Sequence, residues 1–203
     1  MSTVRRRASD LIAIKLPGRS RLRVSDRAFW AFCRDNPELR LERSARGDLI
    51  VMAPAALDSS SRNAGITAQL WLWNQRSGLG VVFDSSAGFT LPNSAIVGPD
   101  AAWIAADRWD ALSERDRGAF AHVSPDFVVE LRSASDSKNT LRKKMVEYLA
   151  QGVRLGWLID PKVGEVEIYR RNSAVEMLAR PARLTGEDIL PGFVLDLNGI
   201  MTS

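Results

Sequence analysis

The run from Pro125 to Arg132 most constrains how this chain can fold. It is rich in β-branched and aromatic residues and has the length of a strand, yet Glu130 stands where a fully buried strand would carry an aliphatic side chain. Because strand side chains alternate between two faces, Glu130 is expected on the same face as Val128 and Arg132. The other face is then apolar, with Phe127, Val129 and Leu131. An acid and a base therefore share one face of this strand.

A second carboxylate opens another apolar strand. Asp100 follows Pro99 and precedes the run Ala101 to Ile104. Two carboxylates at strand positions, from segments separated by a helix-sized connection, can converge on one hard divalent cation through oxygen ligands. The sequence thus offers Asp100 and Glu130 as a candidate metal site.

A helix is predicted to follow the Glu130 strand. Asp136 or Ser137 can cap its start, Gly152 suits a left-handed end, and an apolar stripe runs between them through Leu141, Met145, Tyr148 and Leu149. On the helical period, Lys144 lies on the flank of this stripe, and Lys143 points to solvent. Two interpretations of Lys144 stay open at this point. It can reach a metal-bound water or a phosphate, or its methylenes can simply cover the edge of the core.

These residues resemble the PD-(D/E)XK nuclease superfamily, which has the restriction-endonuclease-like fold, and within it the Uma branch of bacterial endonucleases. The likeness extends from about Arg40 to Leu197. It rests on the segments 39–43, 47–54, 62–63, 97–100, 125–136, 144–148 and 156–161. The resemblance implies that Asp100 and Glu130, with the backbone carbonyl of Leu131, bind Mg²⁺ or Mn²⁺. It also implies that a lysine orients or activates the attacking water.

The tripeptide at the site departs from the superfamily pattern. It reads Glu130-Leu131-Arg132, with arginine in place of lysine. Arginine stays protonated in proteins, so Arg132 can hold a phosphate or neutralise developing charge but is a poor proton shuttle. The Uma branch carries a lysine at the position matching Lys144, and the resemblance therefore assigns the water to Lys144.

Two further residues have open roles. Glu42 lies in a predicted hairpin of residues 39–43 and 48–52, where the resemblance makes it an accessory acid of the metal site and the hairpin alone makes it a solvated carboxylate. Arg62 starts a predicted helix to about Arg76 and falls on its buried side, so it needs an anionic partner. That partner can be the scissile phosphate, a site carboxylate or an ordinary structural ion pair.

Length and composition bound the remaining possibilities. The 203 residues suit one globular domain over residues 25–203, after a basic arm at 1–24 that is expected to be disordered. The single cysteine, Cys33, excludes an internal disulfide. Neither a membrane-spanning run nor a signal-peptide core is visible, so a cytoplasmic location without membrane contact is expected. The single histidine, His122, argues against histidine-based zinc or triad chemistry, which leaves carboxylate-metal chemistry.

The positive net charge is local. Residues 1–24 hold seven of the 28 Lys and Arg residues and one of the 24 Asp and Glu residues, a net +6, so the other 179 residues carry a net −2. Attraction to phosphate would then depend on the arm or on a local patch, although such arms also occur as plain solubilising tails.

The order of elements predicts an α/β or α+β fold with a mixed sheet flanked by helices. Beyond the segments above, it includes a short helix at 25–36 and strands at 80–84, 88–92, 100–105, 154–159, 166–170 and 175–179. The expected function is a magnesium-dependent DNA endonuclease, with Arg132 or Arg62 stabilising the phosphate. A homodimer, with Trp71 as a candidate contact, would suit cleavage of both strands. A binding or scaffold protein of the same fold without cleavage is the alternative, and RNA as substrate stays open.

Overall fold

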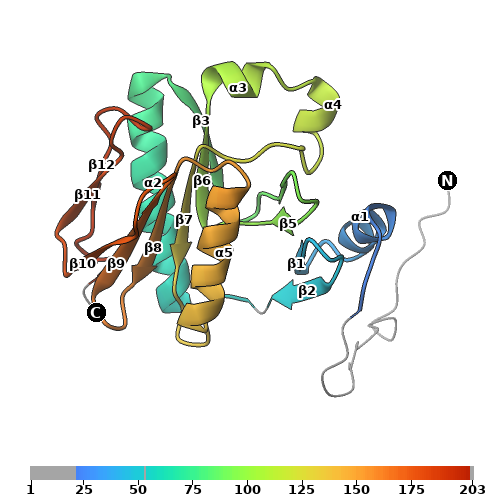
Figure 1. Ribbon diagram of the computed structural model, residues 1–203, viewed down its shortest axis with the longest axis horizontal. Coiled ribbons are helices and arrows are strands. Elements are labelled where there is room, and N and C mark those ends of the chain that lie inside the picture. The colour runs from blue at the N-terminus through green and yellow to red at the C-terminus, as the bar shows by residue number, and fades with distance from the viewer. Residues whose placement is uncertain (1–21, 53, 202–203) are drawn as a thin grey trace.

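The computed structural model describes residues 22–52 and 54–201, and a six-stranded mixed sheet forms its centre (Figure 1). The strand order is β10 (Glu176–Ala179), β9 (Glu165–Arg170), β8 (Leu155–Asp160), β7 (Phe127–Leu131), β6 (Ala101–Ala105) and β3 (Gly80–Asp84). β7 and β8 run parallel, and every other neighbouring pair is antiparallel. The predicted mixed sheet flanked by helices is confirmed.

Two long helices, α2 (Leu57–Ser77) and α5 (Lys138–Ala150), cover opposite faces of this sheet. The alternation along β7 decides which residues each helix meets. Phe127, Val129 and Leu131 pack in one buried cluster with Ile66 and Leu70 of α2, whereas Val128 packs with Met145 and Tyr148 of α5. Each such side chain contributes about 1.5–3 kcal/mol when it is fully buried. The predicted faces of β7 are therefore confirmed, and Glu130 lies on the α5 side.

α5 packs closely on the sheet because β8 has a glycine beneath it. A Cβ atom on Gly156 would lie 2.5 Å from Met145 Cε and 3.3 Å from Val128 Cγ2. The helix begins after Ser137, whose side chain makes no capping hydrogen bond, and Gly152 follows its end with a φ of 107°. Close packing at Gly156 fixes the height of α5 above β7, and with it the position of Lys144.

A second sheet of four antiparallel strands lies beside the first. Its order is β2 (Leu49–Met52), β1 (Arg40–Arg43), β5 (Ile96–Val97) and β4 (Phe89–Thr90). β1 and β2 form the predicted hairpin, with Gly47 at a φ of 84° in its turn. β3 and β4 lie at the predicted strands 80–84 and 88–92, which follow each other closely in the chain but belong to different sheets. The small sheet brings β1 and Glu42 toward the chain segment that leads into β6.

The remaining elements are short. They are α1 (Asp26–Asp35), α3 (Ala106–Asp110), α4 (Glu114–Arg117), β11 (Arg183–Thr185) and β12 (Val194–Asp196). The sequence predicted α1 but not α3, α4, β5, β11 or β12, and α2 begins five residues before the expected Arg62. None of these differences moves the strands that carry the candidate acids.

The prediction of a disordered arm over residues 1–24 falls mostly on residues 1–21, which lie outside the described part. Leu22 and Val24 are described and pair with the β1–β2 hairpin: the backbone N–H of Leu49 donates to Leu22 O at 2.7 Å, and that of Val24 donates to Gly47 O at 2.8 Å. Across the described residues, no helix combines the length and the apolar character that crossing a bilayer requires.

Candidate functional site

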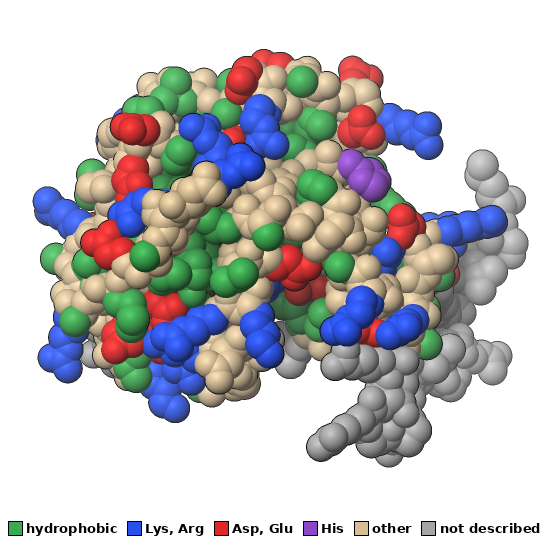
Figure 2. Space-filling model, viewed as in Figure 1, with side chains coloured by type: hydrophobic (Ala, Val, Ile, Leu, Met, Phe, Trp, Pro, Cys, Tyr) green, Lys and Arg blue, Asp and Glu red, His purple; other side chains and the backbone are tan. Residues whose placement is uncertain are grey.

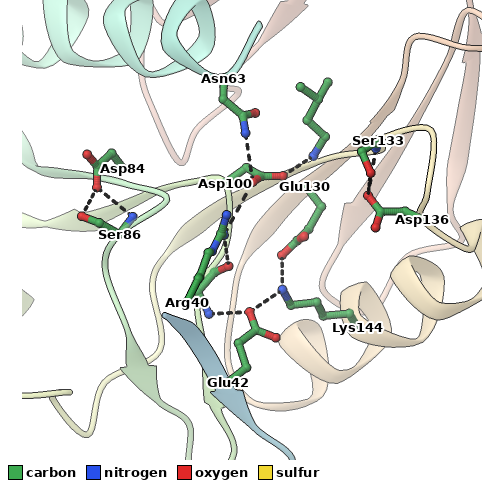
Figure 3. A network of polar contacts seen from close by, with 12 residues as sticks. Arg40, Glu42, Asn63, Asp84, Ser86, Asp100, Glu130, Ser133, Asp136 and Lys144 are labelled. Atoms are coloured by element: carbon green, nitrogen blue, oxygen red, sulfur yellow. Dashed lines mark hydrogen bonds and ion pairs between the residues drawn. The ribbon is translucent and has the colours of Figure 1, made fainter. Parts of the chain in front are cut away.

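Four separate parts of the chain bring polar side chains to one place (Figure 3). β1 supplies Glu42, the turn before β6 supplies Asp100, β7 supplies Glu130, and α5 supplies Lys144. These are four of the residues that the sequence analysis singled out, and they lie between 14 and 102 positions apart along the chain. The two sheets and α5 must pack together before the four side chains can meet.

Lys144 stands between two carboxylates. Its Nζ lies 2.9 Å from Glu42 Oε1 and 2.9 Å from Glu130 Oε1, and its side chain is only 17% exposed. Burial by itself would lower the pKa of Lys144, but Glu130 and Glu42 outweigh that effect and the pKa is raised. Lys144 therefore stays an ammonium that donates hydrogen bonds, and it does more than cover the edge of the core.

Glu130 is almost fully buried. Its Oε1 accepts a hydrogen bond of 2.8 Å from the hydroxyl of Tyr148, one turn beyond Lys144 on α5. Burial raises the pKa of Glu130 to about 7; Lys144 opposes this shift, and Asp100 and Glu42 add to it by repulsion. The neighbouring acids are thus close enough for each to disfavour the charge on Glu130.

Asp100 is held by the backbone of the strand that carries Glu130. Its Oδ2 accepts from the backbone N–H of Leu131 at 2.8 Å, and its Oδ1 accepts from Asn63 Nδ2 at 3.1 Å. Burial raises the pKa of Asp100, while the Leu131 hydrogen bond and the nearby charges of Arg40 and Lys144 lower it. Arg40 NH2 lies 3.7 Å from Asp100 Oδ1 and also donates to Gly98 O at 3.0 Å.

Glu42 is buried rather than solvated. Besides Lys144, the backbone N–H of Gly98 donates to Glu42 Oε1 at 2.8 Å. Glu42 therefore lies beside the other acids, the position that the resemblance implied, and not in solvent as the hairpin alone suggested.

Arg132 and Arg62 do not pair with the carboxylates of the candidate site. Arg132 binds Asp160 Oδ2 at 2.7 Å through NH1 and the backbone oxygen of Asp136 at 3.2 Å through Nε. Asp160 is 1% exposed, so this is a buried ion pair beyond the end of β7. Arg62 pairs within α2 with Asp58 at 3.0 Å. Both arginines have partners of the ordinary structural kind.

Three residues at the site had no assigned role in the sequence: Arg40, Asn63 and Tyr148. Each had a local signal. Arg40 lies two positions before Glu42 and so shares its strand face, Asn63 follows Arg62 in the predicted helix, and Tyr148 lies one turn after Lys144. What the sequence could not supply was the partner of each side chain.

The donor set fits a hard divalent cation. Asp100, Glu130 and Glu42 supply three carboxylates against the two positive charges of Lys144 and Arg40, and Mg²⁺ prefers such oxygen ligands. Asn63 Oδ1 is buried without a hydrogen-bond partner in the described part of the chain, which leaves a carbonyl oxygen beside Asp100 for a water or a cation. As the side chains stand, with Lys144 between two of the acids, no group of three or more His, Cys, Asp or Glu among the described residues is arranged around a metal position.

The comparisons with known proteins show the family and the fold. The sequence model of the Uma2 family, described as "Putative restriction endonuclease", matches residues 27–198. A crystal structure of a putative nuclease of the family DUF820 from Anabaena variabilis is similar in fold, with a TM-score of 0.70 and 19% sequence identity over 81% of this chain and 90% of that one. No curated protein matches the chain.

Proposed function

Because the chain belongs to the Uma2 family of putative restriction endonucleases, we propose that it hydrolyses phosphodiester bonds of DNA with the help of Mg²⁺ or Mn²⁺. One observation carries the proposal: Lys144 is held by Glu42 and Glu130 at the same place where Asp100 is fixed by the backbone of the Glu130 strand. A purely structural core has no need for two buried carboxylates and a third, largely buried one in one spot.

Asp100 and Glu130 are the proposed protein ligands of the cation, with the carbonyl oxygen of Leu131. The backbone N–H of Leu131 points at Asp100. Since the N–H and C=O of one strand residue project to the same side, the Leu131 carbonyl is directed toward Asp100 as well. When bound, the cation supplies positive charge to the phosphate oxygens and acidifies water.

Lys144 is the proposed positioning group for the attacking water. Because its pKa is raised, it acts as a hydrogen-bond donor and not as the base that takes the proton of the water. Glu42 and Glu130 fix the direction of its ammonium group, so that a water or a phosphate oxygen can accept the remaining hydrogen bond. In the hydrolysis the water oxygen forms a bond to phosphorus and loses a proton to solvent, while one ester P–O bond breaks and its leaving oxygen takes up a proton.

Arg40 takes the phosphate-binding role that the sequence suggested for Arg132 or Arg62. Its guanidinium lies 3.7 Å from Asp100 and is a third exposed on the same side of the site. A fixed, always charged guanidinium suits an oxyanion that gains negative charge during the reaction.

We also propose the partners and the cellular location of the chain. DNA is the proposed substrate, and a homodimer would allow both strands of a duplex to be cut. A reducing cytoplasm suits the single, half-buried Cys33.

A plasmid-nicking assay tests the proposal. Supercoiled plasmid should be relaxed by the chain with Mg²⁺ or Mn²⁺ but not with EDTA, and Glu130→Ala should abolish the reaction. Asp110→Asn serves as the matched control because Asp110 is an exposed carboxylate on α3 that pairs with Arg117 and lies outside the site. If wild-type protein and Glu130→Ala are equally inactive on supercoiled plasmid and on single-stranded circular DNA while both bind DNA, the chain is a binding or scaffold protein of the same fold. An RNA substrate in the same assay compares the two nucleic acids.

A further inference from the structure

A cavity of about 890 Å³ opens directly beside Asp100. Its walls come from one face of α2, from the end of β3 with the turn that follows it, and from Arg40 and Asp100 themselves. The residue that carries the proposed metal ligand thus also lines the cavity. A group bound in the cavity would lie next to a phosphate bound at the carboxylates.

The α2 wall combines small side chains with one large ring. Ala64, Ala68, Trp71 and Leu72 follow one another at helical spacing, so they share a face of α2. The two alanines leave open space, and Trp71 borders it. Trp71 is 50% exposed and has no ring partner among the residues that the structure describes. An indole without a ring partner, at the edge of an open cavity, presents a flat face on which a planar group can stack.

The size of the cavity admits a nucleobase. Ligand sites of about 300–1,000 Å³ hold drug-sized molecules, so the cavity has room for a nucleobase with its sugar. A base inside a duplex is paired and stacked, so it can reach such a cavity only when it is unpaired or flipped out of the helix.

The charge distribution also favours a stacking contact. Outside the first 24 residues the chain carries a net −2, and on the face shown in Figure 2 the Lys and Arg side chains are interspersed with Asp and Glu. Broad attraction to the phosphates of a duplex needs many basic contacts. Stacking of a base on an indole adds affinity that does not depend on them.

We propose that this cavity binds an unpaired nucleobase next to the scissile phosphate, stacked on Trp71. The inference rests on the proposed nuclease function and specifies which form of DNA is the substrate. The preferred substrate is single-stranded DNA, or DNA with an unpaired or flipped nucleotide at the cleavage position, rather than a regular duplex.

Binding of short oligonucleotides in EDTA tests this inference without cleavage. Fluorescence anisotropy would compare three labelled probes of equal length: a single strand, its blunt duplex, and a strand whose sugars carry no bases. The proteins are wild type, Trp71→Ala, Trp71→Phe and Trp30→Ala. Trp30 is the matched control, since it is a 41% exposed tryptophan on α1 that contacts Phe120 and does not line the cavity.

The wild type should bind the single strand more tightly than the abasic strand and the duplex. Trp71→Ala should weaken single-strand binding by about fivefold or more, the lower end for one base–aromatic stack, and should bind the abasic strand like the wild type. Trp71→Phe should recover most of the affinity, and Trp30→Ala should change nothing.

The outcomes separate the inference from the proposed function. The base pocket is wrong if the single strand binds wild type and Trp71→Ala with equal affinity. It is also wrong if Trp71→Ala loses as much affinity for the abasic strand as for the normal strand. In both cases the nuclease proposal stands. A Trp71→Ala variant that only turns a dimer into a monomer also overturns the pocket, because Trp71 then contacts a second copy. Failure of every probe to bind, together with failure of plasmid nicking, would overturn both.

Discussion

Lys144 on α5 and Glu130 on β7 form a buried ion pair of 2.9 Å across the interface between helix and sheet. The pair couples the two candidate catalytic groups: the carboxylate raises the pKa of the lysine, and the lysine opposes the upward shift of the carboxylate. A cation that binds Glu130 would therefore compete with Lys144 for the same oxygen atoms. The predictions below follow from this competition and from the partners of the nearby arginines.

Lys144→Ala should reduce the single-turnover cleavage rate by about 10²–10³-fold, the usual cost of removing one preorganised hydrogen-bond donor from a reacting centre. DNA and metal binding should largely persist, because Lys144 is not a proposed ligand of the cation. Lys143→Ala is the matched control, since Lys143 is the next residue and is exposed. Equal cleavage by Lys144→Ala and wild type would leave Lys144 with a structural role only.

Asp100→Asn and Glu130→Gln should each weaken Mn²⁺ binding by more than about tenfold, because each removes an anionic ligand while keeping the shape of the side chain. Isothermal titration calorimetry on the purified chain measures this without any turnover. Asp110→Asn should bind Mn²⁺ like the wild type, since that exposed carboxylate on α3 pairs with Arg117 outside the site. Unchanged Mn²⁺ affinity in Glu130→Gln would remove Glu130 from the ligand set.

Mg²⁺ affinity should rise with pH between about 6 and 8. Glu130 has a pKa near 7, and its proton must leave before the carboxylate can bind a cation. Below that pKa, affinity should fall by up to about tenfold per pH unit for one titrating group. Calorimetry at several pH values should show this slope in the wild type, and a wild-type profile as flat as that of Glu130→Gln would contradict the assignment.

The raised pKa of Glu130 also predicts how the stability of the metal-free protein depends on pH. The folded state holds the Glu130 proton more tightly than the unfolded chain, whose carboxyl keeps its ordinary pKa of 4.5. The contribution of Glu130 to stability is therefore present below about pH 4.5 and is lost as the pH rises to about 7. Urea unfolding of wild type and Glu130→Gln should differ in this pH window, with the wild type losing more stability.

Arg132→Ala should mainly destabilise the fold, by up to about 3 kcal/mol, because it removes a partner of the buried Asp160. The loss is limited because Lys138 Nζ still lies 3.7 Å from Asp160 Oδ2. Arg34→Ala, in an exposed pair with Asp35, should cost less than about 1 kcal/mol. Arg132→Lys should keep partial activity, since it preserves a cation at Asp160. If Arg132→Ala is as stable as the wild type but inactive, Arg132 acts in catalysis after all.

The main elements of the fold could be predicted because each has a local cause. Alternation along Phe127–Leu131 assigns the two faces of β7, and the period of α5 places Lys144 beside the apolar stripe. β5, β11 and β12 could not be predicted in this way. They have two or three residues each, which is too short for a period to appear.

The sequence by itself determined which acids stand at strand positions, and that Lys144 rather than Lys143 faces the core. Only the tertiary structure decided which basic group meets them. Arg132 is two residues from Glu130 but extends beyond the end of β7 to Asp160, whereas Arg40, from the other sheet, reaches Asp100. Spacing along one strand fixes the face of a side chain, but its partner depends on how two sheets and a helix pack, and no local pattern encodes that packing.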